Sequence, residues 1–124
     1  MKFLDTNTIV NAFYLNPNKQ KCEEILKSKN LIINTLILIE VFHILNNILN
    51  KEKAELCIKL ILKSDIQIIP IDINLIFESL KRTHKYNLNF FDLIHYTTAL
   101  LNNCSEIISY DQDFNNLEIK RTEP

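Results

Sequence analysis

The sequence contains no glycine, no tryptophan and only three prolines among its 124 residues. A chain without glycine cannot form the glycine-rich loops that hold phosphates in P-loop and dinucleotide-binding proteins, so both classes are excluded. Asparagine is abundant, and after glycine it is the residue that best tolerates left-handed turns. We therefore expect asparagine to replace glycine where elements end, at positions 16, 30, 50, 102–103 and 115–116.

Cysteine is also scarce, and its spacing excludes two kinds of site. Cys22, Cys57 and Cys104 are far apart and form no C-x-x-C pair, which argues against a disulfide framework and a zinc site. We expect them to act as small apolar residues in a reducing compartment. No secretory segment is evident, and no apolar run approaches the roughly 20 residues that span a bilayer. The sequence therefore predicts a soluble, cytoplasmic protein.

Net charge and length set further limits. The net charge is −1, so no overall basic field indicates a nucleic-acid partner, although a metal site with a local basic patch can still hold phosphates. The length suits a single domain over residues 1–124, with a substantial core. No linker, repeat or low-complexity segment predicts a boundary within it.

Four acidic residues end or interrupt apolar segments: Asp5, Glu40, Asp92 and Asp111. Burying a carboxylate without a partner is very unfavourable, so such acids are usually paired, protonated or bound to metal. Two carboxylates about 4 Å apart repel by roughly 4 kcal/mol at an effective dielectric constant of about 20, and a multivalent cation removes this repulsion. If the fold gathers the four acids, they predict an all-oxygen site for Mg²⁺ or Mn²⁺.

Short apolar segments alternate with amphipathic ones along the chain. Strands are expected at 2–5, 31–33, 66–70, 106–109 and 117–120, and helices at 6–15, 18–28, 35–49, 51–63, 72–86 and 89–103. This alternation predicts a three-layer α/β/α fold, in which helices flank a central parallel sheet of four to five strands. Asp5 and Asp111 follow strands, while Glu40 and Asp92 lie early in helices. All four are therefore expected at the carboxyl edge of the sheet, where such folds bind ligands.

The residues around these acids resemble the PIN-domain ribonucleases, and most closely the VapC-like toxins of type II toxin–antitoxin systems. The resemblance extends over essentially the whole chain. It rests on the segments FLDTN at 3–7, NTLILIE at 34–40, FDLIHYTTA at 91–99 and ISYDQDF at 108–114. It implies a PIN-like doubly wound sheet, Mg²⁺ or Mn²⁺ as cofactor and endonucleolytic cleavage of RNA. It also implies a homodimer and a cognate antitoxin protein as partner.

By this resemblance, Asp5, Glu40, Asp92 and Asp111 match the family's catalytic, metal-binding acids. Asn7 matches a polar position that supports the first acid. Asp113 matches an acid found in many members, although a turn residue is the favoured interpretation here. The implied reaction is metal-assisted hydrolysis of a phosphodiester, which leaves a 5′-phosphate and a 3′-hydroxyl. Asp5 and Asp92 are expected to be direct ligands.

Other interpretations stay open. The chain could be a catalytically silent PIN-like module that binds RNA or a protein partner. A receiver domain is disfavoured, because the segment 66–70 does not end in an acid. His95 and His43 each follow an acid by about one helical turn, and both are interpreted as packed or hydrogen-bonded core residues. The apolar segments 41–49 and 56–62 fit a dimer face and a core equally well.

Overall fold

Five short strands form one parallel sheet in the computed structural model, which describes residues 1–124. The strands are β1 (Lys2–Leu4), β2 (Leu31–Asn34), β3 (Gln67–Ile69), β4 (Glu106–Ile108) and β5 (Lys120–Thr122). Their order across the sheet is β3-β2-β1-β4-β5, and every neighbouring pair is parallel. The predicted fold, a parallel sheet between layers of helices, is confirmed.

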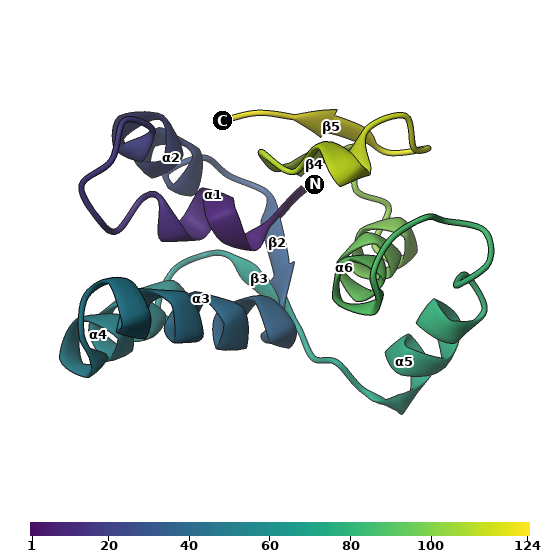
Figure 1. Ribbon diagram of the computed structural model, residues 1–124, viewed down its shortest axis with the longest axis horizontal. Coiled ribbons are helices and arrows are strands. Elements are labelled where there is room, and N and C mark those ends of the chain that lie inside the picture. The colour runs from purple at the N-terminus through teal and green to yellow at the C-terminus, as the bar shows by residue number, and fades with distance from the viewer.

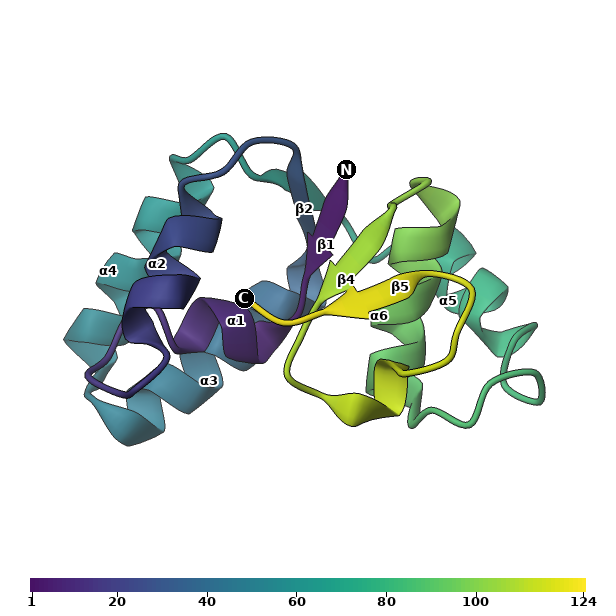
Figure 2. The same ribbon diagram turned by 90° about the horizontal axis from the view of Figure 1, so that it is seen from above.

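Helices cover both faces of this sheet. They are α1 (Thr6–Val10), α2 (Lys19–Leu26), α3 (Thr35–Ile48), α4 (Lys51–Leu62), α5 (Ile73–Leu80) and α6 (Phe90–Leu101), and the 3-10 helix η1 (Gln112–Phe114) joins β4 to β5. The chain steps one way from β1 to β3 and then returns to β4. Right-handed crossovers therefore place α1 to α4 on one face and α5 and α6 on the other. Figures 1 and 2 show this division.

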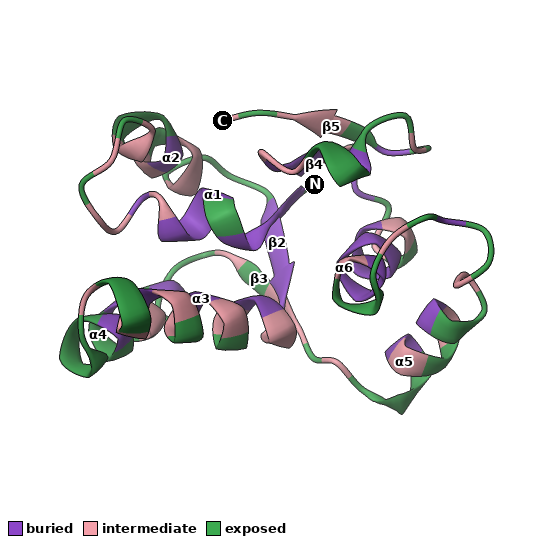
Figure 3. Cartoon of the chain, in the orientation of Figure 1, coloured by how far each residue is buried: buried purple, intermediate pink, exposed green.

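The central strands β1, β2 and β4 are short and largely apolar because helices exclude water from both of their faces. Five strand residues are fully buried in one core cluster: Phe3, Leu4, Ile32, Ile33 and Ile107. Full burial of such a side chain contributes about 1.5–3 kcal/mol. Figure 3 shows that burial is concentrated in β2, α1 and α6, whereas α4 exposes much of its outer surface. The packed core of the molecule thus lies beneath the carboxyl ends of β1, β2 and β4.

Asparagine does take the place of glycine in left-handed turns. The non-glycine residues with positive φ are Asn30 at 61°, Asn103 at 54° and Asn116 at 61°. All three are among the positions at which the sequence predicts such turns. Asparagine tolerates this conformation because its short polar side chain can bond locally to the backbone.

Several predicted boundaries were wrong. The first helix ends at Val10, and residues 11–17 form turns in which Asn16 donates hydrogen bonds to the carbonyls of Asn11 and Tyr14. The fifth helix ends at Leu80, because residues 81–86 also form turns. The last strand begins at Lys120 rather than near residue 117. Its apolar signal came from Ile119, a loop residue packed into the core.

Two further predictions concern single residues. All three cysteines are free and buried, as expected of small core residues. The prediction for His43 was wrong, since this residue is exposed. The buried face of α3 carries Ile37, Val41 and Leu45 at intervals of four, and a residue two positions after Val41 lies on the opposite side of the helix.

Among the helices, none combines the length and the apolar character that a membrane-spanning segment needs.

Candidate metal centre

The acids that the sequence singles out gather near the carboxyl ends of β1 and β4, two neighbouring strands. After β1 the chain moves across the sheet toward β2, whereas after β4 it moves the opposite way toward β5. Such a reversal opens a crevice at the carboxyl edge of a parallel sheet. Asp5 directly follows β1, and Ser109 and Asp111 follow β4. The topology therefore brings together groups that are about a hundred positions apart in sequence.

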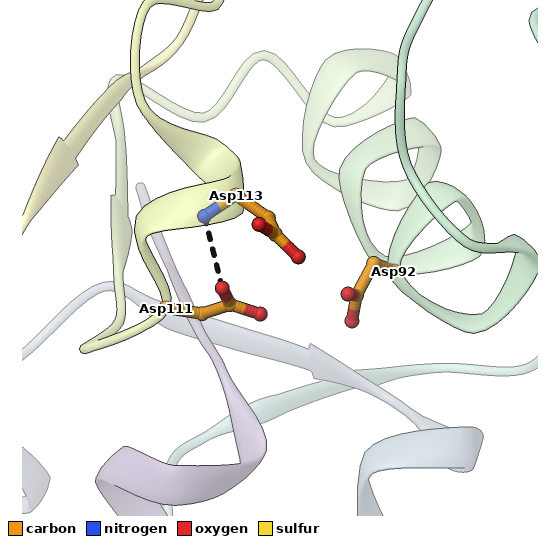
Figure 4. A group of neighbouring side chains, drawn as sticks. All are labelled: Asp92, Asp111 and Asp113. Atoms are coloured by element: carbon orange, nitrogen blue, oxygen red, sulfur yellow. Dashed lines mark hydrogen bonds between the residues drawn. The ribbon is translucent and has the colours of Figure 1, made fainter.

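Three carboxylates form the exposed part of this site. Single oxygens of Asp92, Asp111 and Asp113 all lie within 4.8 Å of one another. Figure 4 shows Asp92, from α6, facing Asp111 and Asp113, which lie at the start of η1. Asp111 caps η1, and its Oδ1 accepts a 2.9 Å hydrogen bond from the backbone N–H of Asp113. The tight turn of η1 thus aims both of its acids at the first turn of α6.

Asp92 is held in place by Asn89, the N-cap of α6. Asn89 Oδ1 accepts a 2.9 Å hydrogen bond from the backbone N–H of Asp92, and Asn89 Nδ2 donates one of 3.0 Å to Asp92 Oδ2. Partial burial, together with the charges of Asp5 and Asp111, raises the pKa of Asp92 to about 6. The carboxylate therefore lies where negative charge is unfavourable without a cation.

Asp5 forms the buried floor of the site and is only 5% exposed. Its carboxylate accepts hydrogen bonds of 2.8 Å from the backbone N–H of Thr6 and 2.5 Å from the hydroxyl of Ser109. Burial raises the pKa of Asp5, although the hydrogen bond from Ser109 partly opposes this. The Ser109 hydroxyl also accepts a 2.9 Å hydrogen bond from the backbone N–H of Asp111. One serine therefore joins the floor of the site to the exposed acids.

Glu40 lies on α3 and is held differently from the aspartates. Its Oε1 accepts hydrogen bonds of 2.7 Å from the hydroxyl of Thr6 and of 2.7 Å from Nε2 of His95. Burial raises the pKa of Glu40, but the contacts with His95 and Thr6 lower it more, so that it lies below the ordinary value. Glu40 is therefore ionised at neutral pH.

No basic side chain neutralises the aspartates of the site. The ion pairs of Lys and Arg involve Glu23, Glu78, Glu106, Glu118 and Glu123. The only acid of the site in such a contact is Glu40, whose partner is His95. A group of uncompensated carboxylate oxygens is the donor set that hard divalent cations such as Mg²⁺ and Mn²⁺ prefer. The chemistry of the residues thus fits such a cation.

The predicted site residues differ in their surroundings. Asp92 and Asp111 lie in one cluster, Asp5 is joined to Asp111 through Ser109, and Glu40 is joined to the residue after Asp5 through Thr6. Asp113, for which a turn was favoured, lies in η1 and also contributes an oxygen to the cluster. Asn7 is exposed and its side chain forms no hydrogen bond, so its supporting role stays a prediction.

The residues that hold the acids were largely missed in the sequence. Ser109 and Thr6 are the direct donors to the acids, yet nothing in their spacing distinguishes them from ordinary polar residues. One signal was available for Ser109, which is a polar residue directly after a buried strand and two positions before Asp111. The interpretation of His95 as a hydrogen-bonded core residue agrees with its 1% exposure.

One sizeable cavity lies away from this site. It has a volume of about 730 Å³ and is lined by residues at the amino ends of β1, β2 and β3, among them Met1, Leu31 and Gln67. The acids lie at the opposite, carboxyl edge of the same sheet. Here the chemistry of the side chains, rather than the depth of a pocket, indicates the functional site.

Comparisons with known proteins agree with this arrangement. No curated protein sequence matches the chain significantly. Several solved structures share its fold at low sequence identity. VapC20 of Mycobacterium tuberculosis, a toxin that cleaves the sarcin–ricin loop, has a TM-score of 0.84 at 15% identity, with 100% of both chains covered. A toxin–antitoxin complex from Klebsiella pneumoniae has a TM-score of 0.77 at 20% identity, with 98% of this chain and 97% of the other covered.

A third structure is VapBC2 of Rickettsia felis, which was solved bound to a DNA fragment from its promoter. It has a TM-score of 0.72 at 18% identity, with 98% of this chain and 97% of the other covered. In sequence, the PIN domain family matches residues 2–120, nearly the whole chain. The chain therefore belongs to the PIN domain family, as its acidic segments suggested.

Proposed function

We propose that this protein is a metal-dependent endoribonuclease and the toxin of a toxin–antitoxin pair. The observation that carries the proposal is the convergence of Asp92, Asp111 and Asp113 within 4.8 Å, above the buried Asp5. Membership of the PIN domain family makes a nuclease the function that best accounts for these acids. Without a cation, such a cluster would only add repulsion to the folded state.

The aspartates are the residues that would hold Mg²⁺ or Mn²⁺ in this proposal. When bound, a divalent cation supplies Lewis-acid stabilisation of charge on the phosphate and lowers the pKa of water. Asp5, fixed by Ser109 and the N–H of Thr6, would serve as the rigid ligand at the floor. Asp92, Asp111 and Asp113 lie more exposed, where an RNA phosphate can approach.

Glu40 completes the cation site in this proposal. It is ionised at neutral pH because the donors His95 and Thr6 lower its pKa. Both donors bond to Oε1, which leaves Oε2 free of hydrogen bonds from the protein. We assign to Oε2 the task of adding one oxygen to the aspartates that would hold the cation.

An antitoxin and a second copy of the chain are the proposed protein partners. Solved structures with this fold include a toxin–antitoxin complex. The helix α4 carries Leu56 and Leu60, which are 58% and 52% exposed and lie one turn apart on the helix. Exposed apolar residues in such proximity are typical of protein interfaces. Of the two apolar segments that fitted either a dimer face or a core, 41–49 contributes Val41 and Leu45 to the core. We therefore propose the exposed side of α4, within 56–62, as the dimer face.

The activity is tested with purified protein and total RNA, in Mg²⁺ or Mn²⁺ and in EDTA. We expect fragments with 5′-phosphate ends that appear only with the cation and are lost in Asp92→Asn. Asp65→Asn is the matched control, because Asp65 is an exposed aspartate beside the cavity at the opposite edge of the sheet. It should cleave RNA as the wild type does.

A second measurement separates a nuclease from a silent module. Mn²⁺ should raise the melting temperature of the wild type, because a ligand that binds only the folded state stabilises it. It should raise that of Asp92→Asn much less. A protein that shows neither the shift nor cleavage of RNA is a silent PIN-like module, and the proposed function is then wrong.

A further inference from the structure

His95 is buried and forms a hydrogen bond through each nitrogen of its ring. Its exposed fraction is 1%. Nε2 lies 2.7 Å from Oε1 of Glu40, and Nδ1 lies 3.1 Å from Nδ2 of Asn34. The ring therefore links the N-cap of α3 to an acid within the same helix. A buried histidine with two defined partners is fixed in orientation, since any rotation breaks both bonds.

Asn34 determines which nitrogen of the ring carries the proton. Its Oδ1 accepts a 3.0 Å hydrogen bond from the backbone N–H of Ile37, and its Nδ2 donates one of 3.0 Å to the hydroxyl of Thr98. A flipped amide would set Nδ2 against the N–H of Ile37, and two donors cannot bond to each other. Nδ2 therefore faces His95, whose Nδ1 must accept. The proton of the ring then lies on Nε2, facing Glu40.

At Glu40 this arrangement places both hydrogen bonds on one carboxylate oxygen and leaves the other without a donor from the protein. Oε1 receives both donors, His95 and Thr6, and no group of the protein donates to Oε2. Two hydrogen bonds on one oxygen hold the carboxylate against rotation, and hydrogen bonds to a charged acceptor are the stronger kind. A carboxylate held in this way presents a single oxygen to the site.

We propose that His95, oriented by Asn34, is a positioning residue that holds Glu40 with Oε2 directed to the divalent cation of the acidic site. The inference rests on the proposed function, because it requires Glu40 to belong to a cation site. His95 acts only through Glu40 and has no contact with the substrate. Hydrogen-bond partners of metal-binding groups usually change the affinity for the metal by about 10- to 100-fold when they are removed.

The first test measures Mn²⁺ affinity by calorimetry in three variants. His95→Leu removes both hydrogen bonds and should weaken binding by about 10- to 100-fold. His95→Gln should recover most of the affinity, because its amide N–H can donate to Glu40. The control is Tyr96→Phe, on the same helix as His95. It removes a buried hydrogen bond that the Tyr96 hydroxyl accepts from the backbone N–H of Ile119, and it touches no acid of the site. It should bind Mn²⁺ as the wild type does.

The second test needs no cation and no variant. Long-range ¹H–¹⁵N spectra of the imidazole rings distinguish a proton on Nε2 from one on Nδ1. We expect the Nε2–H tautomer for His95, with the exposed His43 and His84 as internal references. An Nδ1–H tautomer overturns the inference, even if His95→Leu does not fold.

The outcomes separate this inference from the proposed function. If the wild type binds Mn²⁺ and His95→Leu binds it equally well, the positioning role is wrong while the nuclease proposal stands. If Tyr96→Phe loses as much affinity as His95→Leu, the effect is one of general stability, and the positioning role is again wrong. If the wild type binds no Mn²⁺ at all, the proposed function fails and the inference fails with it.

Discussion

The hydroxyl of Ser109 donates a 2.5 Å hydrogen bond to Oδ2 of Asp5, across a separation of 104 residues in sequence. The hydroxyl oxygen of Ser109 also accepts a hydrogen bond from the backbone N–H of Asp111. Asp5 is buried, so this bond stabilises a negative charge that water cannot reach. The connection also links the loop after β4 to the end of β1, in addition to the pairing of the two strands.

Ser109→Ala should therefore destabilise the protein by about 1–3 kcal/mol at neutral pH, the usual effect of leaving a buried acceptor without its donor. The loss should shrink toward pH 4, because a protonated Asp5 depends less on the donor. Urea unfolding at both pH values measures it. Ser105→Ala is the control, since Ser105 is an exposed serine at the other end of β4. Equal losses in the two variants would show that Asp5 does not depend on Ser109.

Asp92→Asn should change the pH dependence of stability in the absence of metal. The pKa of Asp92 is raised from 3.8 to about 6. Between these values the folded protein binds more protons than the unfolded chain, so its stability falls as pH rises through this window. Above pH 6 the whole penalty is present, although solvent screens part of it because Asp92 is only half-buried.

The asparagine has no such penalty, so the variant gains relative to the wild type as pH rises. We expect the difference in melting temperature, variant minus wild type, to be more positive at pH 7.5 than at pH 4.5 in EDTA. Saturating Mn²⁺ should reverse the order at pH 7.5, because only the wild type has the full set of ligands. A difference that does not vary with pH would show that the carboxylate of Asp92 is not perturbed.

The layered fold could be predicted because β1, β2 and β4 lie in short apolar segments that alternate with helical ones. Asn34 and Asn89 are the N-caps of α3 and α6, and each accepts a hydrogen bond from a backbone N–H in the first turn of its helix. The ends of α1 and α5 were less predictable. The turn after α1 continues the apolar pattern at Ala12 and Phe13, and that pattern does not distinguish a helix from a turn packed on the core. Residues 81–86 after α5 contain no glycine or proline that would mark the end of the helix.

The acids of the site could be predicted from the sequence, but the hydrogen bonds that hold them could not. Asp5 and Glu40 stand out as acids in apolar segments, a signal that a single sequence carries. The donors that hold them do not stand out. Ser109 and His95 reach their acids through pairings 104 and 55 residues apart, and only the packed fold determines such pairings. Asp113 was predicted to be a turn residue, and its backbone N–H does take part in the turn of η1. Its carboxylate also belongs to the acidic cluster, which the turn prediction did not include.

Asn103 should respond in opposite directions to glycine and alanine. It ends α6 with φ at 54°, and the N–H groups of Asn103 and Cys104 donate to the carbonyls of Leu100 and Ala99. This pattern requires a left-handed residue at position 103. Asn103→Gly should therefore be neutral or stabilising, whereas Asn103→Ala should lose about 1 kcal/mol. Chemical denaturation of both variants measures the difference, and equal stabilities would contradict the assignment of this turn.

Thr97 and Thr98 are neighbours on α6, both 0% exposed, and their hydroxyls differ in one respect. The hydroxyl of Thr97 has no hydrogen-bond partner, whereas that of Thr98 accepts from Asn34 and donates to the carbonyl of Ile94. Valine has nearly the same shape and helix propensity as threonine, so replacement isolates the effect of the hydroxyl. Thr97→Val should gain about 1 kcal/mol by removing a desolvated polar atom. Thr98→Val should lose about 1–3 kcal/mol by leaving Asn34 unsatisfied. Urea midpoints that shift in the same direction for both variants would show that these hydroxyls do not have the different surroundings described here.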